Sequence, residues 1–144
     1  MASDVTSGQA SDVTWLLTNL VQKVPQTRSA LLLSSDGVKK NWHGLDSSGA
    51  DTLSAIASGL CSLARSAGKH FGGGNGVRQV VAELDDALLF VSAAGPGAVL
   101  AVVASRDADA GVIGYEMAQL VKRVPSYLAT PARHAATAFG DLSG

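Results

Sequence analysis

The stretch "VRQVVAELDDALLFVSAAGPGAVLAVVAS" (residues 77–105) carries the clearest signals of secondary structure in this chain. Its two turn signals, Asp-Asp and Gly-Pro-Gly, divide it into three strands, which we predict over residues 77–84, 87–94 and 98–105. The last two strands are apolar at nearly every position, a pattern typical of strands that are covered on both faces. The sequence therefore predicts a β-meander within a sheet that carries helices on each side.

A hairpin is predicted earlier in the chain. An apolar run at residues 30–33 is followed by the turn signal Asp36-Gly37 and by a second strand at about residues 38–43. The two lysines of the second strand discourage pairing with a further strand. We therefore expect this strand to lie at an edge of the sheet.

Three helices are predicted from apolar residues at helical spacing, over residues 12–24, 49–71 and 109–124. In the long middle helix, the face predicted to be apolar consists of Leu53, Ile56, Ala57, Leu60, Leu63, Ala64, Ala67 and Phe71. Another face carries only small residues, and Gly59 within it costs about 1 kcal/mol relative to alanine. Either close packing of a second helix or drift on a solvated surface accounts for these small residues.

Composition limits the class of protein. The 144 residues are 47% hydrophobic and only 16% charged, which leaves too few charges to solvate every face. Some apolar surface is therefore expected to be shared with a partner. The net charge of −1 and the lack of a basic run argue against nucleic-acid binding, which rests on a concentrated positive face. We expect one domain over residues 12–126, flanked by disordered tails at 1–11 and 127–144.

The sequence predicts a cytoplasmic protein without direct membrane insertion. It begins with no cationic and apolar leader, and no apolar run approaches the ~20 residues that span a bilayer. Cys61 is the only cysteine, so no internal disulfide is possible. Its apolar helical surroundings predict a small buried thiol and not a reactive one.

The glycine-rich segment at residues 72–76 is predicted to reverse the chain. Phosphate-binding loops run from strand to glycines to helix, so that the free N–H groups of the helix meet the ligand. Here the order is helix, glycines, strand, and the glycines follow the negative end of the helix dipole. Gly72 is expected to cap that helix in the left-handed conformation.

No group of residues points to catalysis by this chain alone. The three histidines are scattered, and no cluster has the spacing of a metal site. Glu83, Asp85 and Asp86 resemble paired carboxylates, but solvated turn residues are the simpler interpretation, since nothing apolar nearby would separate their pKa values. No catalytic, cofactor-binding or metal-binding residue is predicted.

The element order, the stretch "ALLLSSDGV" (residues 30–38) and the meander resemble the roadblock (dynein light chain) domain family over residues 12–126. The resemblance is to bacterial members encoded beside small Ras-like GTPases, such as the partner of the gliding-motility GTPase and the roadblock proteins of actinobacterial conservons. It implies an α+β fold, in which a five-stranded antiparallel sheet has the long helix on one face and the first and last helices on the other.

The resemblance also implies a homodimer in which the strands at 77–84 pair edge to edge and the long helices at 50–70 lie together. The residues that this arrangement brings to the interface are Val77, Gln79, Val81, Glu83, Ala55, Ser58, Gly59 and Ser62. Arg65 and Lys69 on the long helix could meet an acidic partner surface, with solvated charge as the alternative.

The function implied by the resemblance is that of a non-enzymatic adaptor which binds and modulates a small Ras-like GTPase in bacterial signalling. Some family members raise the hydrolysis rate of the GTPase without supplying a catalytic arginine, and a membrane-associated sensor kinase complex is a further implied partner. The alternative is a small-molecule-sensing domain of profilin-like topology. In that case Trp42, Phe71 and Phe90 would line a pocket between the sheet and the long helix, although ordinary core positions are the simpler interpretation.

Overall fold

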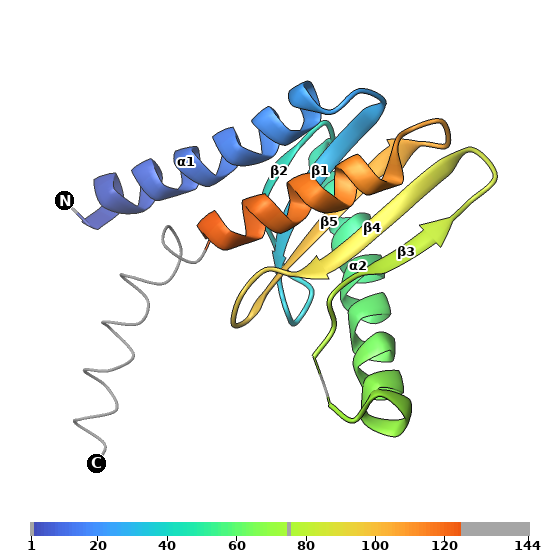
Figure 1. Ribbon diagram of the computed structural model, residues 1–144. Coiled ribbons are helices and arrows are strands. Elements are labelled where there is room, and N and C mark those ends of the chain that lie inside the picture. Colours follow the sequence, from blue (N-terminus) through green and yellow to red (C-terminus); the bar gives the residue numbers. More distant parts are fainter. Residues whose placement is uncertain (1, 75, 125–144) are drawn as a thin grey trace, which may run out of the picture.

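The computed structural model describes residues 2–74 and 76–124, with side chains from residue 12 onward (Figure 1). Its elements follow the predicted order of helix, two strands, long helix, three strands and helix. In chain order they are α1 (Ala2–Lys23), β1 (Thr27–Ser34), β2 (Lys39–His43), α2 (Ser47–Ala67), the π-helical turn η1 (Gly68–Gly72), β3 (Val80–Glu83), β4 (Ala87–Ala93), β5 (Ala98–Ser105) and a last helix at residues 110–124.

The five strands form one antiparallel sheet in the order β2-β1-β5-β4-β3. The hairpin and the meander join where β1 pairs with β5, so the most apolar strands lie in the middle. The predicted edge position of β2 is confirmed. The Lys39 ammonium of β2 lies 2.9 Å from the carboxylate of Asp51 on the long helix. It also lies 5.1 Å from the centroid of the Trp42 ring on its own strand.

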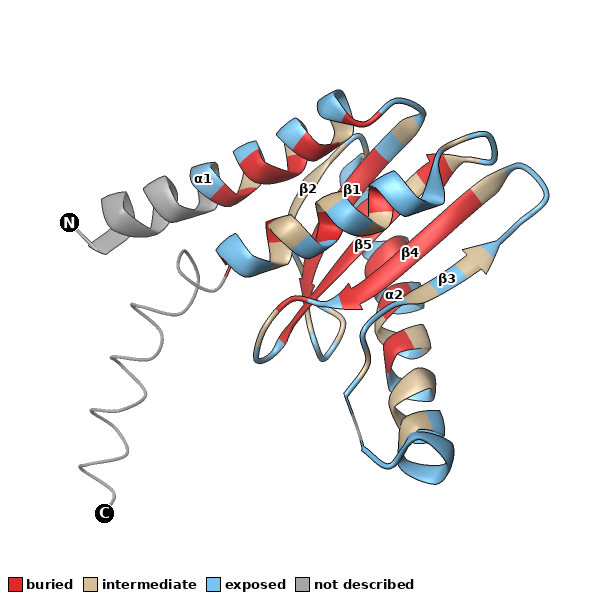
Figure 2. Ribbon diagram, viewed as in Figure 1, coloured by how far each residue is buried: buried red, intermediate tan, exposed pale blue. Residues whose placement is uncertain are grey.

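Two hydrophobic clusters lie on opposite faces of the sheet (Figure 2). The alternation of side chains along a strand divides them: on β5, Leu100 and Val102 face α1 and the last helix, whereas Val99 and Ala101 face α2. Helices thus cover both faces, with α2 alone on one and the first and last helices together on the other. This confirms the predicted α+β architecture and explains the apolar runs.

Two side-chain contacts hold α1 on the edge of the hairpin. The Asn41 amide donates to the Thr14 hydroxyl over 3.1 Å, and the Thr18 hydroxyl lies 3.2 Å from Nδ1 of His43. The Thr18 hydroxyl also lies within hydrogen-bond distance of the carbonyl of Thr14, at 2.9 Å. The position of α1 is therefore set by polar contacts as well as by its apolar stripe.

The first helix begins earlier than predicted. We expected residues 1–11 to form a loose tail, but α1 begins at Ala2. Residues 2–11 contain no proline, so nothing in them interrupts a helix that extends from the packed turns toward the N-terminus. Residues 125–144, which include the predicted C-terminal tail at 127–144, lie outside the described residues.

The glycine-rich segment reverses the chain after α2, as predicted, with a shift of one residue at the cap. The left-handed residue is Gly73, with φ of 75°, and not Gly72, which ends the helical turn η1. A π turn takes one more residue than an α turn before the chain can leave the helix. The N–H of Gly74 then donates to the carbonyl of Gly68 at 3.3 Å.

Asp46 caps the start of α2, and its loss should destabilise the fold. Its carboxylate accepts a hydrogen bond of 2.6 Å from the N–H of Gly49. We expect Asp46→Ala to lower the free energy of unfolding by about 1 kcal/mol, because an N–H of the first turn loses its partner. Urea denaturation measures the loss. Asp46→Asn keeps a capping oxygen and should be near wild type, and equal losses for both variants would contradict the capping role.

The turn between β1 and β2 carries an aspartate whose titration reports its hydrogen bond. The Ser34 hydroxyl donates a hydrogen bond to the Asp36 carboxylate. This hydrogen bond lowers the pKa of Asp36, and a backbone hydrogen bond and the charge of Lys40 add smaller effects in the same direction. At pH values above the ordinary pKa of a carboxyl group, the lowered pKa of Asp36 stabilises the fold. This stabilisation is lost as the pH falls through the pKa of Asp36 in the folded state. Ser34→Ala should raise the pKa of Asp36 in an NMR titration, whereas Ser35→Ala should leave it unchanged.

Candidate interaction surface

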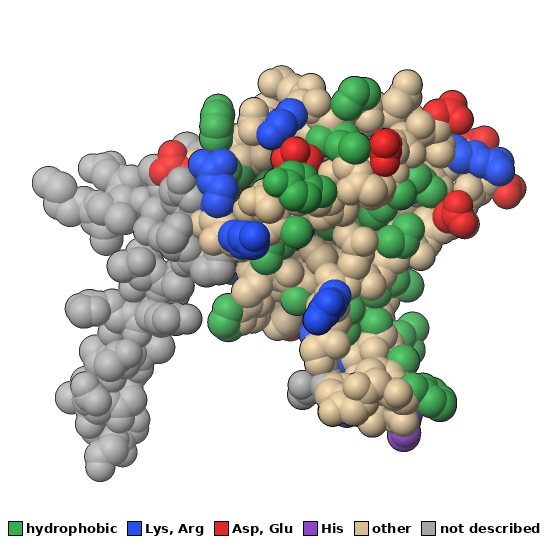
Figure 3. Space-filling view, viewed as in Figure 1, with side chains coloured by type: hydrophobic (Ala, Val, Ile, Leu, Met, Phe, Trp, Pro, Cys, Tyr) green, Lys and Arg blue, Asp and Glu red, His purple; other side chains and the backbone are tan. Residues whose placement is uncertain are grey.

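An exposed apolar surface lies at the β3 edge of the sheet. We define the β3–α2 surface by Ile56, Leu63, Phe71, Val81 and Leu84, whose exposed fractions are 47%, 71%, 91%, 47% and 54%. Figure 3 shows hydrophobic side chains gathered below β3 and along α2 to its tip. Exposed apolar side chains that gather in one region of a soluble protein mark an interaction site more often than scattered ones do.

This surface exists because α2 extends beyond the sheet (Figure 1). Within α2 the buried side chains end at Cys61, which confirms the predicted buried thiol. Beyond that point the helix has no strand beneath it. Our prediction that Leu63 and Phe71 belong to a buried face is therefore wrong, because helical spacing identifies the apolar side of a helix but not the extent of the sheet below it. The same prediction is wrong for Ile56 for another reason: it lies in the part of α2 that covers the sheet, but its side chain is turned outward.

The outer edge of β3 completes the surface. β3 pairs with β4 on one side, and among the described strands nothing pairs with its other side. Val80 and Ala82 pack toward α2, whereas Val81 lies opposite Phe90 and points to the other face. An edge strand with free N–H and C=O groups is a template for pairing with another chain.

β3 is shorter than the predicted strand at 77–84. Val77 precedes it and packs against the α2-side cluster. Gln79 also precedes it, with its amide 4.0 Å from the sulfur of Met117 on the last helix and beside Gly114. Val77 is thus half-buried and Gln79 is exposed beside the last helix, whereas Val81 and Glu83 lie on the exposed edge strand itself.

The small residues of α2 divide into two groups. Ala55, Gly59 and Ser62 are exposed, and a Cβ added at Gly59 would meet nothing within 4 Å. Ser58 lies about 200° around the helix from Ile56, so the two side chains point to nearly opposite sides. The Ser58 hydroxyl donates to the carbonyl of Ser35 at 3.2 Å. Ser58 thus supports the β1–β2 turn within the protomer, and its predicted place at the dimer interface stays a prediction.

The two predicted partner-binding cations do not converge on one point. Arg65 lies back along α2, with its guanidinium 3.6 Å from the Cys61 sulfur, and is half-buried. Lys69 is exposed on η1. Both lie on the C-terminal half of the helical segment, where a partner could reach them from beyond the sheet.

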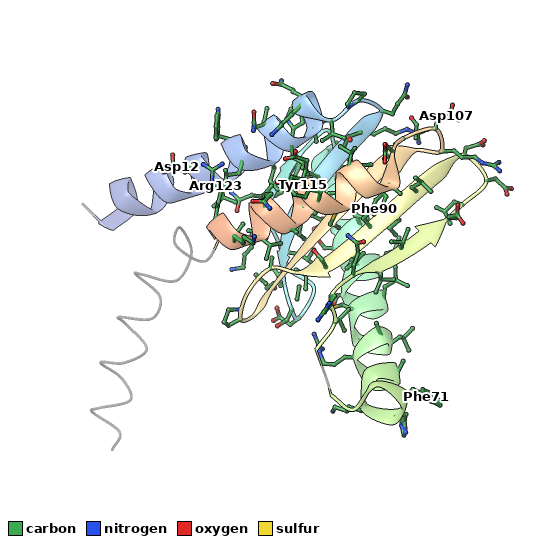
Figure 4. All side chains as sticks on the ribbon, viewed as in Figure 1. Asp12, Phe71, Phe90, Asp107, Tyr115 and Arg123 are labelled. Carbon is green, nitrogen blue, oxygen red and sulfur yellow. The ribbon has the colours of Figure 1, made fainter. Side chains whose placement is uncertain are left out.

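The three aromatic residues considered for a small-molecule pocket lie apart, and Figure 4 shows Phe90 on the sheet and Phe71 near the tip of the long helix. Phe90 is fully buried in the cluster beneath α1 and the last helix, Trp42 packs against the α2-side cluster, and Phe71 is exposed near the tip. They do not line one pocket, because the sheet itself separates Phe90 from Trp42. Within residues 2–74 and 76–124, no group of His, Cys, Asp and Glu could hold a metal ion, and no helix is long and apolar enough to cross a bilayer.

The chain belongs to the Roadblock/LC7 domain family, which it matches over residues 13–104. A Roadblock/LC7 domain from Streptomyces avermitilis is 63% identical, with a TM-score of 0.78 over 81% of this chain and 97% of that chain. A second such domain from the same species is 37% identical, with a TM-score of 0.63 over 76% and 95%. The gliding protein MglB from Thermus thermophilus, at 19% identity and a TM-score of 0.71 over 85% and 90%, shares the fold. No curated protein matches the chain.

Proposed function

We propose that this protein is a non-enzymatic homodimeric adaptor that binds and modulates a small Ras-like GTPase in bacterial signalling. Membership of the Roadblock/LC7 family and the resemblance to members encoded beside such GTPases support the partner. The observation that carries the proposal is the β3–α2 surface, where an open strand edge adjoins exposed apolar side chains.

A second copy of the chain is the simplest occupant of that surface. In a twofold dimer the same patch of each subunit meets itself, so β3 pairs antiparallel with β3 and the sheet continues across the interface. The long helices then approach each other on the outside of the joined sheets. Ala55, Gly59 and Ser62 permit close contact, and Ile56 and Leu63 provide the apolar area that becomes buried.

The GTPase is expected to bind beside this dimer, where the C-terminal halves of the two α2 helices lie. Arg65 and Lys69 on that segment would meet acidic groups of the partner, and their role would be to attract and orient it. The effect on hydrolysis would come from holding the switch regions of the GTPase, without a catalytic arginine. We propose a cytoplasmic location, with association to the membrane through partners such as a membrane-associated sensor kinase complex.

The test uses the purified protein and a Ras-like GTPase encoded beside its gene. Light scattering at micromolar concentration should give the mass of a dimer, and calorimetry should detect binding that differs between the GDP-bound and GTP-analogue-bound states. Arg65→Ala combined with Lys69→Ala should weaken GTPase binding and leave the dimer intact, whereas Arg106→Ala should change neither. A monomer would overturn the dimer, and no binding in either nucleotide state would overturn the GTPase partnership.

A further inference from the structure

Three exposed apolar side chains form a stripe along one side of α2 and η1. We define the α2 stripe by Ile56, Leu63 and Phe71, whose exposed fractions are 47%, 71% and 91%. Ile56 and Leu63 are seven residues apart, which is close to two full turns of an α-helix. Phe71 follows Leu63 after eight residues, but one of the turns between them is the π turn of η1, which takes one residue more. The three side chains therefore lie along the same side of the helix.

The α2 stripe carries no charge. Between Asp51 and Lys69 the only charged residue is Arg65, and it lies two residues from Leu63, or about 200° around the helix. Its guanidinium lies 3.6 Å from the sulfur of the buried Cys61, so it is directed away from the stripe. An uncharged apolar stripe fits a surface of its own kind, because a charged group placed against it would lose water without gaining an opposite charge.

The stripe lies on the side of α2 toward which the open edge of β3 runs. On the opposite side of the helix, Ser58 contacts Ser35 in the β1–β2 turn. The N–H of Ser35 donates to the carbonyl of Gly97, so that side of α2 lies at the end of the sheet where β4 ends and β3 begins. From there β3 leads to the other end of the sheet, on the stripe side of α2 (Figure 1). A chain that pairs with β3 therefore lies beside the stripe.

Pairing of two β3 strands in one sheet fixes the relative direction of the long helices. The twofold axis of such a pair is perpendicular to the sheet, so the two α2 helices run antiparallel on the same face. The axis passes the outer edge of β3, where α2 leaves the sheet. Because the buried side chains of α2 end at Cys61, the midpoint of the helix pair falls close to this residue.

Gly59 marks the point of closest approach. It is exposed, and a Cβ placed there would meet nothing within 4 Å in its own chain, so the protomer gives no reason for a residue that destabilises a helix relative to alanine. A second helix that passes here supplies the reason. Ile56 and Leu63 lie equally far before and after the midpoint between Gly59 and Leu60. In an antiparallel pair centred there, Ile56 of one copy therefore meets Leu63 of the other.

We propose that the α2 stripe sets the register in which two copies of this chain pair. Ile56 of each copy packs against the partner's Leu63, with Gly59 and Leu60 beside the twofold axis. The π turn keeps Phe71 in line with the stripe, and its exposed ring lies beside the start of the partner's long helix. This inference rests on the proposed dimer and adds the residues by which one copy recognises the other.

A second copy fits this side of the molecule better than other occupants. It supplies a strand edge for β3 and an uncharged apolar stripe for α2, so one interface covers both. A bilayer offers no strand to the free N–H and C=O groups of β3. A GTPase that used acidic groups to reach Arg65 would approach the other side of the helix, where that residue lies.

The experiment places charges on the stripe of the full-length protein and measures the dissociation constant of the dimer by analytical ultracentrifugation. Ile56→Lys with Leu63→Lys brings like charges together at both contacts, whereas Ile56→Lys with Leu63→Glu brings opposite charges together. Both positions are exposed in the protomer, so the fold tolerates either pair, and circular dichroism verifies this. We expect the variant with opposite charges to dimerise at least about tenfold more tightly than the variant with like charges.

Val112→Lys with Tyr115→Lys adds the same charge at exposed apolar residues on the opposite face of the sheet, and should leave the dissociation constant unchanged. Equal dissociation constants for the two stripe variants in a wild-type dimer would overturn the register and leave the proposed dimer standing. Tighter pairing of the like-charged variant would also overturn it, and so would a loss of GTPase binding with an unchanged dimer, which would assign the stripe to the GTPase. A monomeric wild type would overturn the proposed dimer itself.

Discussion

Replacing Val81 with aspartate is expected to convert the protein from a dimer into a monomer. Val81 lies on the open edge strand with 47% of its surface exposed, so a monomer tolerates a charge there. In the proposed dimer the two β3 strands run antiparallel, and two carboxylates would then lie close together between them. The lost apolar contact and the buried charge should cost about 3 kcal/mol, or roughly a hundredfold in the dissociation constant. Analytical ultracentrifugation over a concentration series measures the change.

Two variants control for the position and the chemistry of this substitution. Val81→Thr keeps the β-branched shape without a charge and should retain most of the dimer. Val38→Asp makes the same change at an exposed valine in the turn beside the opposite sheet edge, and should leave the mass unchanged. Val81→Asp protein that sediments like wild type at every concentration would exclude the β3 edge as the interface.

A substitution on α2 tests the same dimer through a different element. Nothing within the protomer lies within 4 Å of a Cβ placed at Gly59. Leucine there should therefore stabilise the isolated helix by up to about 0.8 kcal/mol. If the two long helices approach each other at this residue, the leucine should separate them and lower the dimer mass. A raised unfolding temperature with an unchanged dimer would show that Gly59 lies outside the interface.

Replacing Phe90 with alanine should produce the largest loss of folding stability. Among the described residues Phe90 is the largest fully buried side chain, and it lies in the middle of β4 beneath α1 and the last helix. Removing its ring leaves a cavity that the packed helices and sheet can only partly close, and such changes cost about 3–5 kcal/mol. For a domain whose total stability is about 5–15 kcal/mol, this is a large fraction.

Chemical denaturation of Phe90→Ala and Phe90→Leu separates the cavity from the loss of the aromatic ring. The leucine variant fills most of the volume, so its loss of unfolding free energy should stay below about 1.5 kcal/mol. Equal losses for the two variants would indicate that the ring, and not the volume, is what the core requires. A wild-type midpoint for Phe90→Ala would place the side chain outside the core.

Much of the fold could be predicted because the decisive signals are local. β4 and β5 are apolar at successive positions, and only strands covered on both faces have that pattern, so helices on each side of the sheet followed at once. The order of the elements followed from turn signals between apolar runs. The glycines after the long helix indicated a chain reversal, because they are a turn signal of the same local kind. Only the predicted position of the left-handed cap, Gly72 in place of Gly73, was wrong.

The interaction surface was predicted in part. Val81, Gly59, Ala55 and Ser62 are exposed, as a shared surface requires, but the most apolar members of that surface, Ile56 and Leu63, were assigned to the core. A simple comparison of lengths would have found Leu63. The 21 residues of α2 extend about 32 Å, whereas five strands about 4.8 Å apart span only about 19 Å.

The set of elements and the faces on which they are apolar can be read from the sequence alone, because both depend on the spacing of neighbouring residues. Which apolar residues remain uncovered depends on how the elements pack against one another. Leu63 and Leu53 have the same chemistry and lie on the same helix, yet one is exposed and the other is buried, because the sheet ends between them.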